Sequence, residues 1–381
     1  MAGPELDAVV AGSGLSGLSL LAHLAAGPWR DRSVLVIDDG APAWRPATSW
    51  GYWTTGIGLL DGVACRSYAR VRVRAGGRDG VVALGRYRYR IARRRDLDRA
   101  VRLIVDDCPG FEFRPGRVES VHTAGDVAEV VVAGHTYRAS WAFDSVTAEP
   151  AGRPADGHLA FTGWEVRCAE PRFDVETPVL FDFRTPQAGR SRFVYVLPEG
   201  RHRAMVELTE FTGRHTNPST MDDMGASLAA HLDRAGPYDV VRTESAVLPL
   251  RVAPAPRRSG RVLRIGARGG LLKASTGYAY QRIQRDSAAI AASLARHGHP
   301  FALPRPRRRH RLLDAILLEV LDRDPTQLEL AFRQLFLAGP AERVLRFLDE
   351  DTRPLDEIRL AATLPPAPYL RAAPAVLLRR P

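Results

Sequence analysis

Three glycines near the start of the chain have the spacing of a nucleotide-binding loop. Gly12, Gly14 and Gly17 form a G-x-G-x-x-G pattern that follows an apolar run and opens an apolar helical segment. In such a loop the first glycine permits a sharp turn, the second lets the backbone approach a pyrophosphate, and the third allows close helix–strand packing. Asp38 ends the next apolar run, where a carboxylate can accept hydrogen bonds from ribose hydroxyls. These residues predict a dinucleotide site, and an ordinary glycine turn is the alternative.

A second glycine cluster suggests which dinucleotide is bound. Gly266, Gly269 and Gly270 precede a long Ala-rich segment with helical character. Flavoproteins commonly build their FAD pocket from two distant segments, whereas a purely NAD-binding domain needs no late segment of this kind. The two clusters therefore favour FAD, unless the later glycines only form a turn.

The elements around these glycines follow a strand–turn–helix–strand order. The run SVLVID is continuously apolar until it ends in the acid Asp38, as expected for a strand buried on both faces of a parallel sheet. Asp96 is expected to cap a helix through LDRAVRLIVDD. Several strand-like runs with Pro and Gly punctuation cover residues 158–212 and predict an inserted antiparallel sheet. We expect a FAD-binding region in two parts, residues 1–157 and 259–300. An antiparallel substrate domain is expected at 158–258 and a helical C-terminal region at 301–381.

Composition excludes several classes of protein. The 381 residues are 45% hydrophobic and 25% charged, which suits a folded chain with a sizeable core and disfavours global disorder. No apolar run is long enough for a spanning helix, and the acidic start does not resemble a signal peptide. Cys65, Cys108 and Cys168 lack metal-ligand spacing, so we expect no metal site and a reduced, cytoplasmic compartment.

Seven short motifs follow the first glycine loop along the chain, at 48–53, 143–146, 163–166, 181–184, 205–209, 269–278 and 347–352. Together with that loop, their order resembles the bacterial lycopene cyclase family, flavoproteins of the carotenoid pathway. The resemblance runs from about residue 7 to residue 375. Two departures are Val146, where the family has an arginine, and Arg268, where its glycine turn usually has a small residue.

The resemblance implies an α/β fold with a FAD-binding Rossmann-like domain of the glutathione-reductase/hydroxylase type. It also implies acid-catalysed cyclisation of lycopene ψ-ends, with β-rings as the expected product and no net redox change. The family's reaction needs FAD in its reduced form, with NADPH as the expected electron donor. Thr276 and Gly277, in the 269–278 signature, join the glycines as expected cofactor-binding residues.

A proton donor for such a reaction must be a carboxyl group kept protonated by burial among apolar groups. Along the strand-like run at 204–211, alternation places Glu207 on one face with Met205, Thr209 and Phe211. Glu207 is therefore the expected general acid, and the family resemblance points to the same position. Glu165 and Asp182 are weaker candidates for a second proton transfer or for orienting the first acid.

Aromatic side chains in the same motifs could line an apolar tunnel and shelter a cation by their ring faces. The candidates are Trp50, Trp53, Trp164 and Tyr278 as substrate residues, with Tyr52 beside them. Core packing is the competing explanation for each of them. The lone lysine, Lys273, lies in the 269–278 signature and could help to hold an anionic flavin.

The formal net charge is +11, and the densest basic cluster is RPRRRHR at 305–311. The cluster has no interleaved aromatics, which disfavours nucleic acid as a partner. Because lycopene resides in bilayers, we expect peripheral membrane association through this cluster and the C-terminal apolar helices, although a solvated linker would look similar. The alternatives to a cyclase are a flavin-dependent monooxygenase, a polyprenyl or carotenoid oxidoreductase, or a basic binding protein with a vestigial nucleotide fold.

Overall fold

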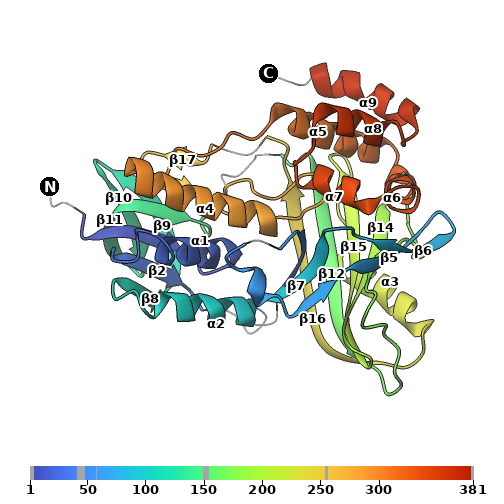
Figure 1. Ribbon diagram of the computed structural model, residues 1–381, viewed down its shortest axis with the longest axis horizontal. Helices are drawn as coiled ribbons and strands as arrows, with labels where there is room; N and C mark the ends of the chain where they lie inside the picture. Colours follow the sequence, from blue (N-terminus) through green and yellow to red (C-terminus); the bar gives the residue numbers. More distant parts are fainter. Residues whose placement is uncertain (1–3, 41–47, 57, 149–153, 254–255, 379–381) are drawn as a thin grey trace.

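A sheet of eight strands forms the half of the molecule that contains the first glycine loop (Figure 1). The computed structural model describes residues 4–40, 48–56, 58–148, 154–253 and 256–378. Strand β1 (Leu6–Ala11) pairs in parallel with β2 (Val34–Asp38) and β11 (His135–Asp144), and β2 pairs in parallel with β8 (Phe111–Pro115). The remaining strands of this sheet are β9 (Val118–Ala124), β10 (Val127–Val132), β17 (Arg258–Ser259) and β18 (Val262–Arg264).

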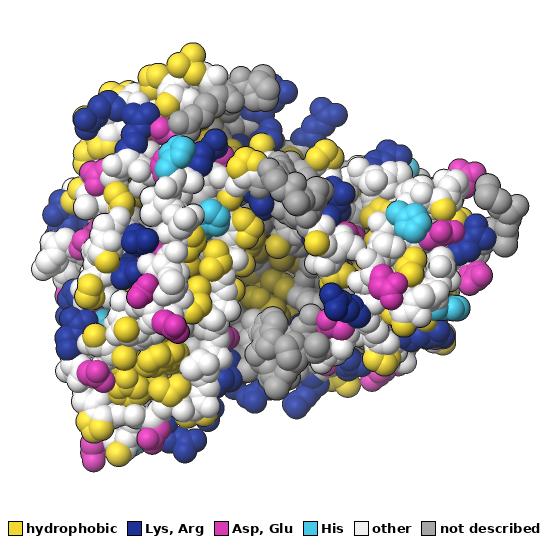
Figure 2. Space-filling view, turned by 180° about the vertical axis from the view of Figure 1, so that it is seen from behind, with side chains coloured by type: hydrophobic (Ala, Val, Ile, Leu, Met, Phe, Trp, Pro, Cys, Tyr) yellow, Lys and Arg dark blue, Asp and Glu magenta, His cyan; other side chains and the backbone are white. Residues whose placement is uncertain are grey.

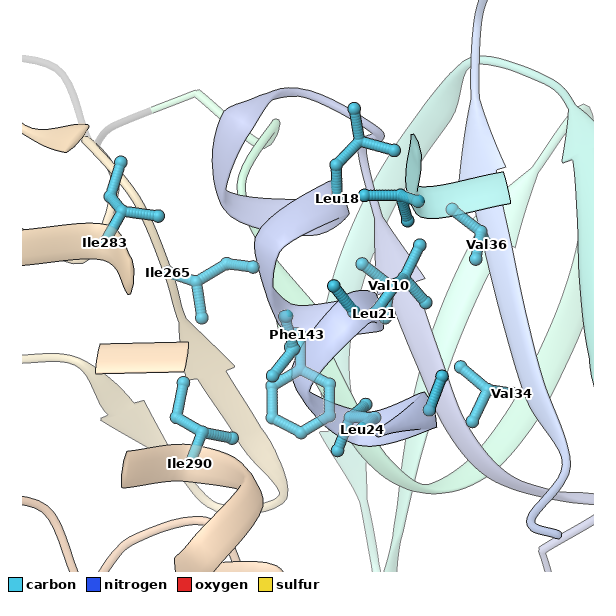
Figure 3. Packing of buried hydrophobic residues seen from close by; sticks show 14 of the residues in the cluster. Val10, Leu18, Leu21, Leu24, Val34, Val36, Phe143, Ile265, Ile283 and Ile290 are labelled. Carbon is cyan, nitrogen blue, oxygen red and sulfur yellow. The ribbon is translucent and has the colours of Figure 1, made fainter. Parts of the chain in front are cut away.

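Both faces of this sheet are covered. Alternation along β1 directs Val10 to one face and Val9 to the other. Val10 packs in a cluster with the helices α1 (Leu15–Ala25), α2 (Arg94–Val105) and α4 (Tyr280–His297), as Figure 3 shows for α1 and α4. Val9 packs in a second cluster with the β9–β10 hairpin. The continuous apolar character of β1 and β2 is thus explained by burial on two sides.

The second large sheet has seven strands in the order β16-β12-β15-β14-β13-β5-β6. All neighbouring strands are antiparallel except β13 and β5, which are parallel. The two strands at one edge come from early in the chain and the other five from after residue 156. The bounds are β5 (Arg70–Ala75), β6 (Arg78–Ala83), β12 (Gly157–Arg167), β13 (Val179–Asp182), β14 (Ser191–Gly200), β15 (Arg203–Gly213) and β16 (Asp239–Leu250).

Helices cover the two faces of the seven-stranded sheet separately. Helix α3 (Met221–Asp233) packs its Met224, Leu228 and Leu232 on one face. The opposite face contributes Phe193 and Phe211 to a cluster with the C-terminal helices (Figure 1). These helices are α5 (Arg308–Arg323), α6 (Gln327–Leu337), α7 (Ala341–Leu348), α8 (Pro354–Ala361) and α9 (Pro366–Leu378).

A small three-stranded sheet connects the two halves. Its strands are β3 (Ser49–Thr54), β7 (Arg88–Arg93) and β4 (Arg66–Tyr68), and a short 3-10 turn, η2 (Asp61–Val63), lies between β3 and β4. Strand β3 contacts α4 of the half with the eight-stranded sheet, whereas β7 contacts β5 of the seven-stranded sheet. Residues from this small sheet therefore lie where the two halves meet.

The expected fold class is confirmed, and two local expectations change. Asp96 does not cap its helix: α2 begins at Arg94 after Arg93, and Asp96 lies in the first turn, where a carboxylate still favours the helix dipole. The expected segment 1–157 is divided between sheets, because β5 and β6 join the strands of the 158–258 segment. Long-range strand pairing of this kind leaves no local signal.

Candidate active site

The first glycine loop has room for a ligand at one of its three glycines. Gly12 has a φ of 99°, and a Cβ there would overlap Ser145 and Val146. A Cβ on Gly17 would overlap the backbone oxygen of Gly12, so helix and strand are in direct contact. At Gly14, the N-cap of α1, no heavy atom lies within 4 Å of such a Cβ. The free space therefore lies at the helix N-terminus, which attracts anionic groups.

Asp38 lies directly beside this loop. Its Oδ2 accepts a hydrogen bond from the Ser13 backbone N–H at 2.7 Å, and its Oδ1 accepts one from Gly40 at 3.0 Å. The side chain also lines a cavity of about 500 Å³. Four arginines of α2, which sequence analysis missed, line the same cavity: Arg94, Arg95, Arg99 and Arg102. The sequence signal that could have indicated them is their spacing of three and four residues along one helix, which places Arg95, Arg99 and Arg102 on one side of it.

The second glycine segment returns to the first loop, as expected from the sequence. Gly266 has a φ of 61°, and a Cβ there would lie 2.5 Å from Ser16 Oγ at the start of α1. Further along, the Thr276 Oγ1 accepts a hydrogen bond from the Tyr278 N–H at 3.3 Å. Gly277 has a φ of 72° and packs on Leu159 of β12. The segment 266–277, which includes Gly269 and Gly270, therefore runs from the nucleotide-binding loop to the seven-stranded sheet.

The two departures from the family pattern lie against the same loop. Val146 contacts Gly12, and its backbone N–H donates to Asp144 Oδ1 at 3.0 Å. Arg268 Nε lies 3.7 Å from Asp144 Oδ2 and donates to Thr147 Oγ1 at 3.4 Å. Position 146 has no positive charge in this chain because it is a valine, and Arg268 supplies a positive charge beside Asp144 instead.

Glu207 lies in β15, on the face of the sheet that points toward the junction of the two halves. Its neighbours across the strands are Gly163 of β12 and Tyr195 of β14. The side chain shares its face with Met205 and with Thr209, whose Oγ1 donates to Glu207 Oε1 at 3.0 Å. Burial, with a smaller contribution from the charge of Glu244, raises the pKa of Glu207 from 4.5 to about 8, and the hydrogen bond from Thr209 opposes this rise. The carboxyl group is therefore largely protonated at neutral pH.

Glu244 is a second carboxyl group at this position and was missed by sequence analysis. It lies in β16, opposite Gly163, so both glutamates flank the same glycine. A Cβ on Gly163 would lie 3.3 Å from Glu244 Cγ and 3.5 Å from Glu207 Cβ. Burial raises the pKa of Glu244, while Arg242, which donates to its Oε2 at 3.3 Å, lowers it. The missing side chain at Gly163 lets the two carboxyl side chains converge.

Three tyrosines lie close to Glu207. The hydroxyls of Tyr195 and Tyr278 are 3.1 Å apart, and Tyr89 packs against Gly51 of β3. Burial raises the pKa of all three well above 10, and the charge of Glu207 contributes to each. These phenols stay protonated, so they present hydrogen-bond donors and aromatic rings to the space around Glu207. Of the three, sequence analysis had named only Tyr278.

Neither of the other two predicted carboxylates resembles a proton donor. Glu165 is buried on the same face as Glu207, but it is ion-paired with Arg203 and with Arg242, whose Nε is 3.0 Å from Oε2. Asp182 is fully buried and pairs with Arg74 at 2.9 Å and Arg184 at 2.8 Å, and these hydrogen bonds lower its pKa despite burial. Asp182 also faces the opposite side of the sheet from its neighbours Phe181 and Phe183 in the C-terminal helix cluster.

The structure places the predicted aromatic residues in different parts of the molecule, and not all of them lie near Glu207. Trp53 lies with its ring 4.3 Å from that of Tyr278 and donates from Nε1 to Asp349 at 2.9 Å, while Tyr52 stacks on Tyr280. Trp50 is half-buried and packs against the nucleotide-binding core. Trp164 is not brought to Glu207. It packs on the α3 side of the sheet. The reason is strand alternation: Gly163 and Glu165, the two chain neighbours of Trp164, face the junction, so Trp164 faces the other side.

A cavity of about 530 Å³ is lined by Met205 and Glu165, which lie on the same face of the sheet as Glu207. Its apolar wall includes Ile91, Leu197 and Met205. Arginine and glutamate side chains line the rest, including Glu165, Glu199, Arg93, Arg203 and Arg242. Figure 2 shows the molecule hollowed between its two halves, with hydrophobic side chains deep in the hollow.

Lys273 is not free to hold a flavin. The ammonium group is buried and lies 3.0 Å from Asp314 and 3.3 Å from Glu350, so it joins the 269–278 segment to the C-terminal region. Within the part of the chain that the structure describes, no group of three or more His, Cys, Asp or Glu side chains is placed to hold a metal ion.

Comparisons with known proteins agree with this architecture. The family model described as "Lycopene cyclase protein" matches residues 7–374. A lycopene beta-cyclase from Paracoccus sp. is 26% identical over 256 residues, which cover 62% of this chain and 64% of that protein, less than two thirds of its length.

Solved structures show the fold. A geranylgeranyl bacteriochlorophyll reductase-like protein from Thermoplasma acidophilum matches with a TM-score of 0.67 at 11% identity, covering 98% of this chain and 100% of that one. HpxO from Klebsiella pneumoniae, in a complex with FAD, matches with a TM-score of 0.62 at 15% identity, covering 91% of this chain and 98% of that one. At sequence identities this low, the TM-scores show a common fold and nothing further.

Proposed function

Since the chain belongs to the lycopene cyclase family, we propose that it cyclises the ψ-ends of lycopene to β-rings, with FAD in its reduced form as the cofactor. The observation that carries the proposal is the position of the Glu207 carboxyl group, next to Gly163 and Tyr195 at the junction of the two halves, where burial raises its pKa to about 8. A hydrocarbon offers no polar group for catalysis, so the reaction must begin with a proton from an acid that burial keeps neutral.

Two segments of the chain are suited to hold FAD. The free space at Gly14 gives a pyrophosphate access to the N-terminus of α1, and the carboxylate of Asp38 lies beside it. The arginines of α2 add positive charge, and the segment 266–277 leads from this loop toward Glu207. Reduced FAD, bound along this path, would supply negative charge that stabilises a carbocation.

The residues around Glu207 account for the proton transfers. Glu207 donates a proton to the terminal double bond, the neighbouring double bond closes the ring on the cation, and a ring proton is then lost to a carboxylate. Glu207, which has just given up its proton, can take one back, and Glu244 shares the site. The product is an isomer of the substrate. The rings of Trp53 and Tyr278 offer their faces to positive charge in this region.

Expression in bacteria that accumulate lycopene tests the proposal. We expect pigments of unchanged mass and altered chromatographic mobility. A gain of oxygen would instead indicate a flavin monooxygenase, and a gain of hydrogen would indicate a polyprenyl or carotenoid reductase. Unchanged lycopene in cells that contain folded, flavin-loaded protein would refute both the cyclase and these alternatives for this substrate.

Replacing Glu244 with glutamine is expected to shift the pH dependence of cyclisation. The Glu244 charge raises the pKa of Glu207, so its removal lowers that pKa and moves the alkaline loss of activity to lower pH. The rate measured against pH in detergent-solubilised assays checks this. Glu199→Gln is the matched control, because Glu199 lines the neighbouring cavity, pairs with Arg93 at 2.7 Å and does not contribute to the pKa shift of Glu207. An unchanged profile in Glu244→Gln would contradict the coupling.

We further propose that NADPH supplies the electrons for flavin reduction in the cytoplasm. Anaerobic addition of NADPH to the purified flavoprotein should bleach the flavin absorbance. NADH at the same concentration serves as the comparison. If the flavin keeps its oxidised spectrum after NADPH is added, NADPH is excluded as a direct electron donor.

The C-terminal helices offer a surface for peripheral membrane docking. No described helix is both long and apolar enough to cross a bilayer. Leu355 and Ile358 of α8 are 67% and 64% exposed, and α8 is tied to the basic stretch through Arg309, whose Nε lies 2.9 Å from Glu357. Arg309 therefore has a structural partner, whereas Arg307 and Arg308 are exposed. We propose that these exposed residues bind the surface of an anionic bilayer.

The double variant Leu355→Gln/Ile358→Gln should reduce sedimentation with anionic liposomes by about tenfold, because two apolar side chains no longer enter the bilayer. Leu103→Gln is the control, since Leu103 is 66% exposed on α2 in the other half of the molecule. Equal sedimentation of both variants and the unaltered protein would remove α8 from the docking surface.

A further inference from the structure

A third cavity lies on the side of the seven-stranded sheet that faces away from Glu207. Its volume is about 620 Å³, within the range of sites for small molecules. Val206, the neighbour of Glu207 in β15, lines it, and alternation along the strand directs these two side chains to opposite faces. The cavity is therefore separated from the candidate active site by the thickness of the sheet.

One part of this cavity is apolar. Val179, Val196 and Val206 come from three adjacent strands, β13, β14 and β15, and Leu232 comes from α3. Val179, Val206 and Leu232 are already largely buried by their neighbours. These side chains form a floor that suits a hydrocarbon chain better than a sugar or a polar metabolite.

Five arginine side chains also line this cavity. Arg72, Arg74 and Arg184 are paired with carboxylates: Arg72 and Arg74 each lie 2.9 Å from Asp79, and Arg74 and Arg184 flank Asp182. These three guanidinium groups therefore have much of their charge compensated within the protein.

Arg172 and Arg234 differ from the other arginines of the cavity. Arg172 Nη1 donates to the backbone oxygen of Gly236 at 3.0 Å. Arg234 Nη2 donates to the backbone oxygen of Arg184 at 2.9 Å and lies 3.0 Å from Nδ1 of His231, which also lines the cavity. Within the described part of the chain, neither has an ion pair with a carboxylate. Carbonyl groups hold both guanidinium groups in place without neutralising them, which leaves two oriented positive charges above an apolar floor.

We propose that this cavity binds an anionic amphiphile, with a phosphate group held by Arg172 and Arg234 and a hydrocarbon chain on the valine floor. Guanidinium groups suit phosphate because their donors form a planar fork. The one carboxylate lining the cavity, Asp174, already accepts from the Glu176 backbone N–H at 3.0 Å. The same chemistry is shared by a soluble alkyl or prenyl phosphate and by the head group of an anionic lipid.

Calorimetric titration of the whole protein with octyl phosphate, below its micellar concentration, tests the proposal. We expect one molecule bound per chain, with affinity at least tenfold lower in Arg172→Gln/Arg234→Gln. Arg78→Gln, in which an exposed arginine at the end of β6 loses the same charge, should bind as the unaltered protein does. Thermal unfolding of each variant verifies that the fold is retained. Full affinity in the double variant would overturn the proposal.

Three further probes separate the contributions. Octanol and inorganic phosphate should each bind at least tenfold more weakly than octyl phosphate, and either one binding as tightly would contradict the two-part site. Vesicles of phosphatidic acid distinguish the source. If they displace octyl phosphate, the cavity accepts a lipid head group; if they do not, it is reserved for soluble phosphates. Vesicle binding through these arginines without any octyl phosphate binding would refute the cavity as the site.

Discussion

Glu207→Gln is expected to reduce cyclisation by at least about a thousandfold, near the range lost when a general acid is removed. Glutamine keeps the shape of the side chain and can still contact Thr209, but it cannot release a proton to a double bond. Conversion of lycopene in cells and in a detergent assay would check the loss. Flavin absorbance of the purified variant should be unchanged. Substantial activity in a flavin-loaded Glu207→Gln protein would exclude Glu207 as the acid.

The same substitution predicts an effect on stability with a defined sign. Because the folded-state pKa of Glu207 is about 8 and its ordinary value is 4.5, the folded protein holds this proton more tightly than the unfolded chain. The carboxyl group therefore destabilises the fold progressively as pH rises from 4.5 to 8. Within that window, the advantage of Glu207→Gln in unfolding free energy should grow by up to about 1.4 kcal/mol per pH unit. Denaturant unfolding at several pH values measures it.

The activity of the unaltered protein should follow the same group. Only the protonated form of Glu207 can start the reaction, so the rate should fall as pH rises through about 8. An activity that rises through this range would contradict the assignment even if Glu207→Gln were inactive.

Gly14→Val is expected to remove FAD and, with it, all cyclisation, while the protein remains folded. The φ of Gly14 is −71°, which a β-branched residue adopts without strain, and no protein atom lies within 4 Å of the added Cβ. The valine would instead occupy the space through which a pyrophosphate reaches the helix N-terminus. We expect colourless protein after purification in excess FAD and an unchanged melting temperature of the apoprotein.

A second glycine provides the control for Gly14. Gly339, between α6 and α7, also has open space around its Cβ position, so Gly339→Val tests the substitution away from the nucleotide loop. Gly339→Val should bind FAD normally. A yellow, stoichiometrically loaded Gly14→Val protein would show that the cofactor does not approach this turn.

The strand face on which Glu207 lies was predictable because its evidence is local. Alternation within one strand is enough to place Glu207, Met205 and Thr209 on one face. The companion Glu244 was not predictable in this way, because nothing in β16 says that it pairs with β12 rather than with another strand. Register across three strands decides that both glutamates flank Gly163.

Trp164 and Asp182 show the converse. Each lies in a motif of the family, and each has a side chain suited to the proposed chemistry, but the pleat turns Trp164 toward α3 and two arginines surround Asp182. Membership of a short motif does not specify which face of a strand meets the junction.

The amino-acid order by itself determined the nucleotide-binding loop, the two-part glycine pattern and the fold class, since turns, strand alternation and helix periodicity depend on residues close together in the chain. The tertiary structure alone decided that Glu244 accompanies Glu207, that β5 and β6 extend the seven-stranded sheet, and that Arg172 and Arg234 surround a cavity behind it. These arrangements join residues far apart in the chain, and the free energy that selects them comes from packing and strand pairing.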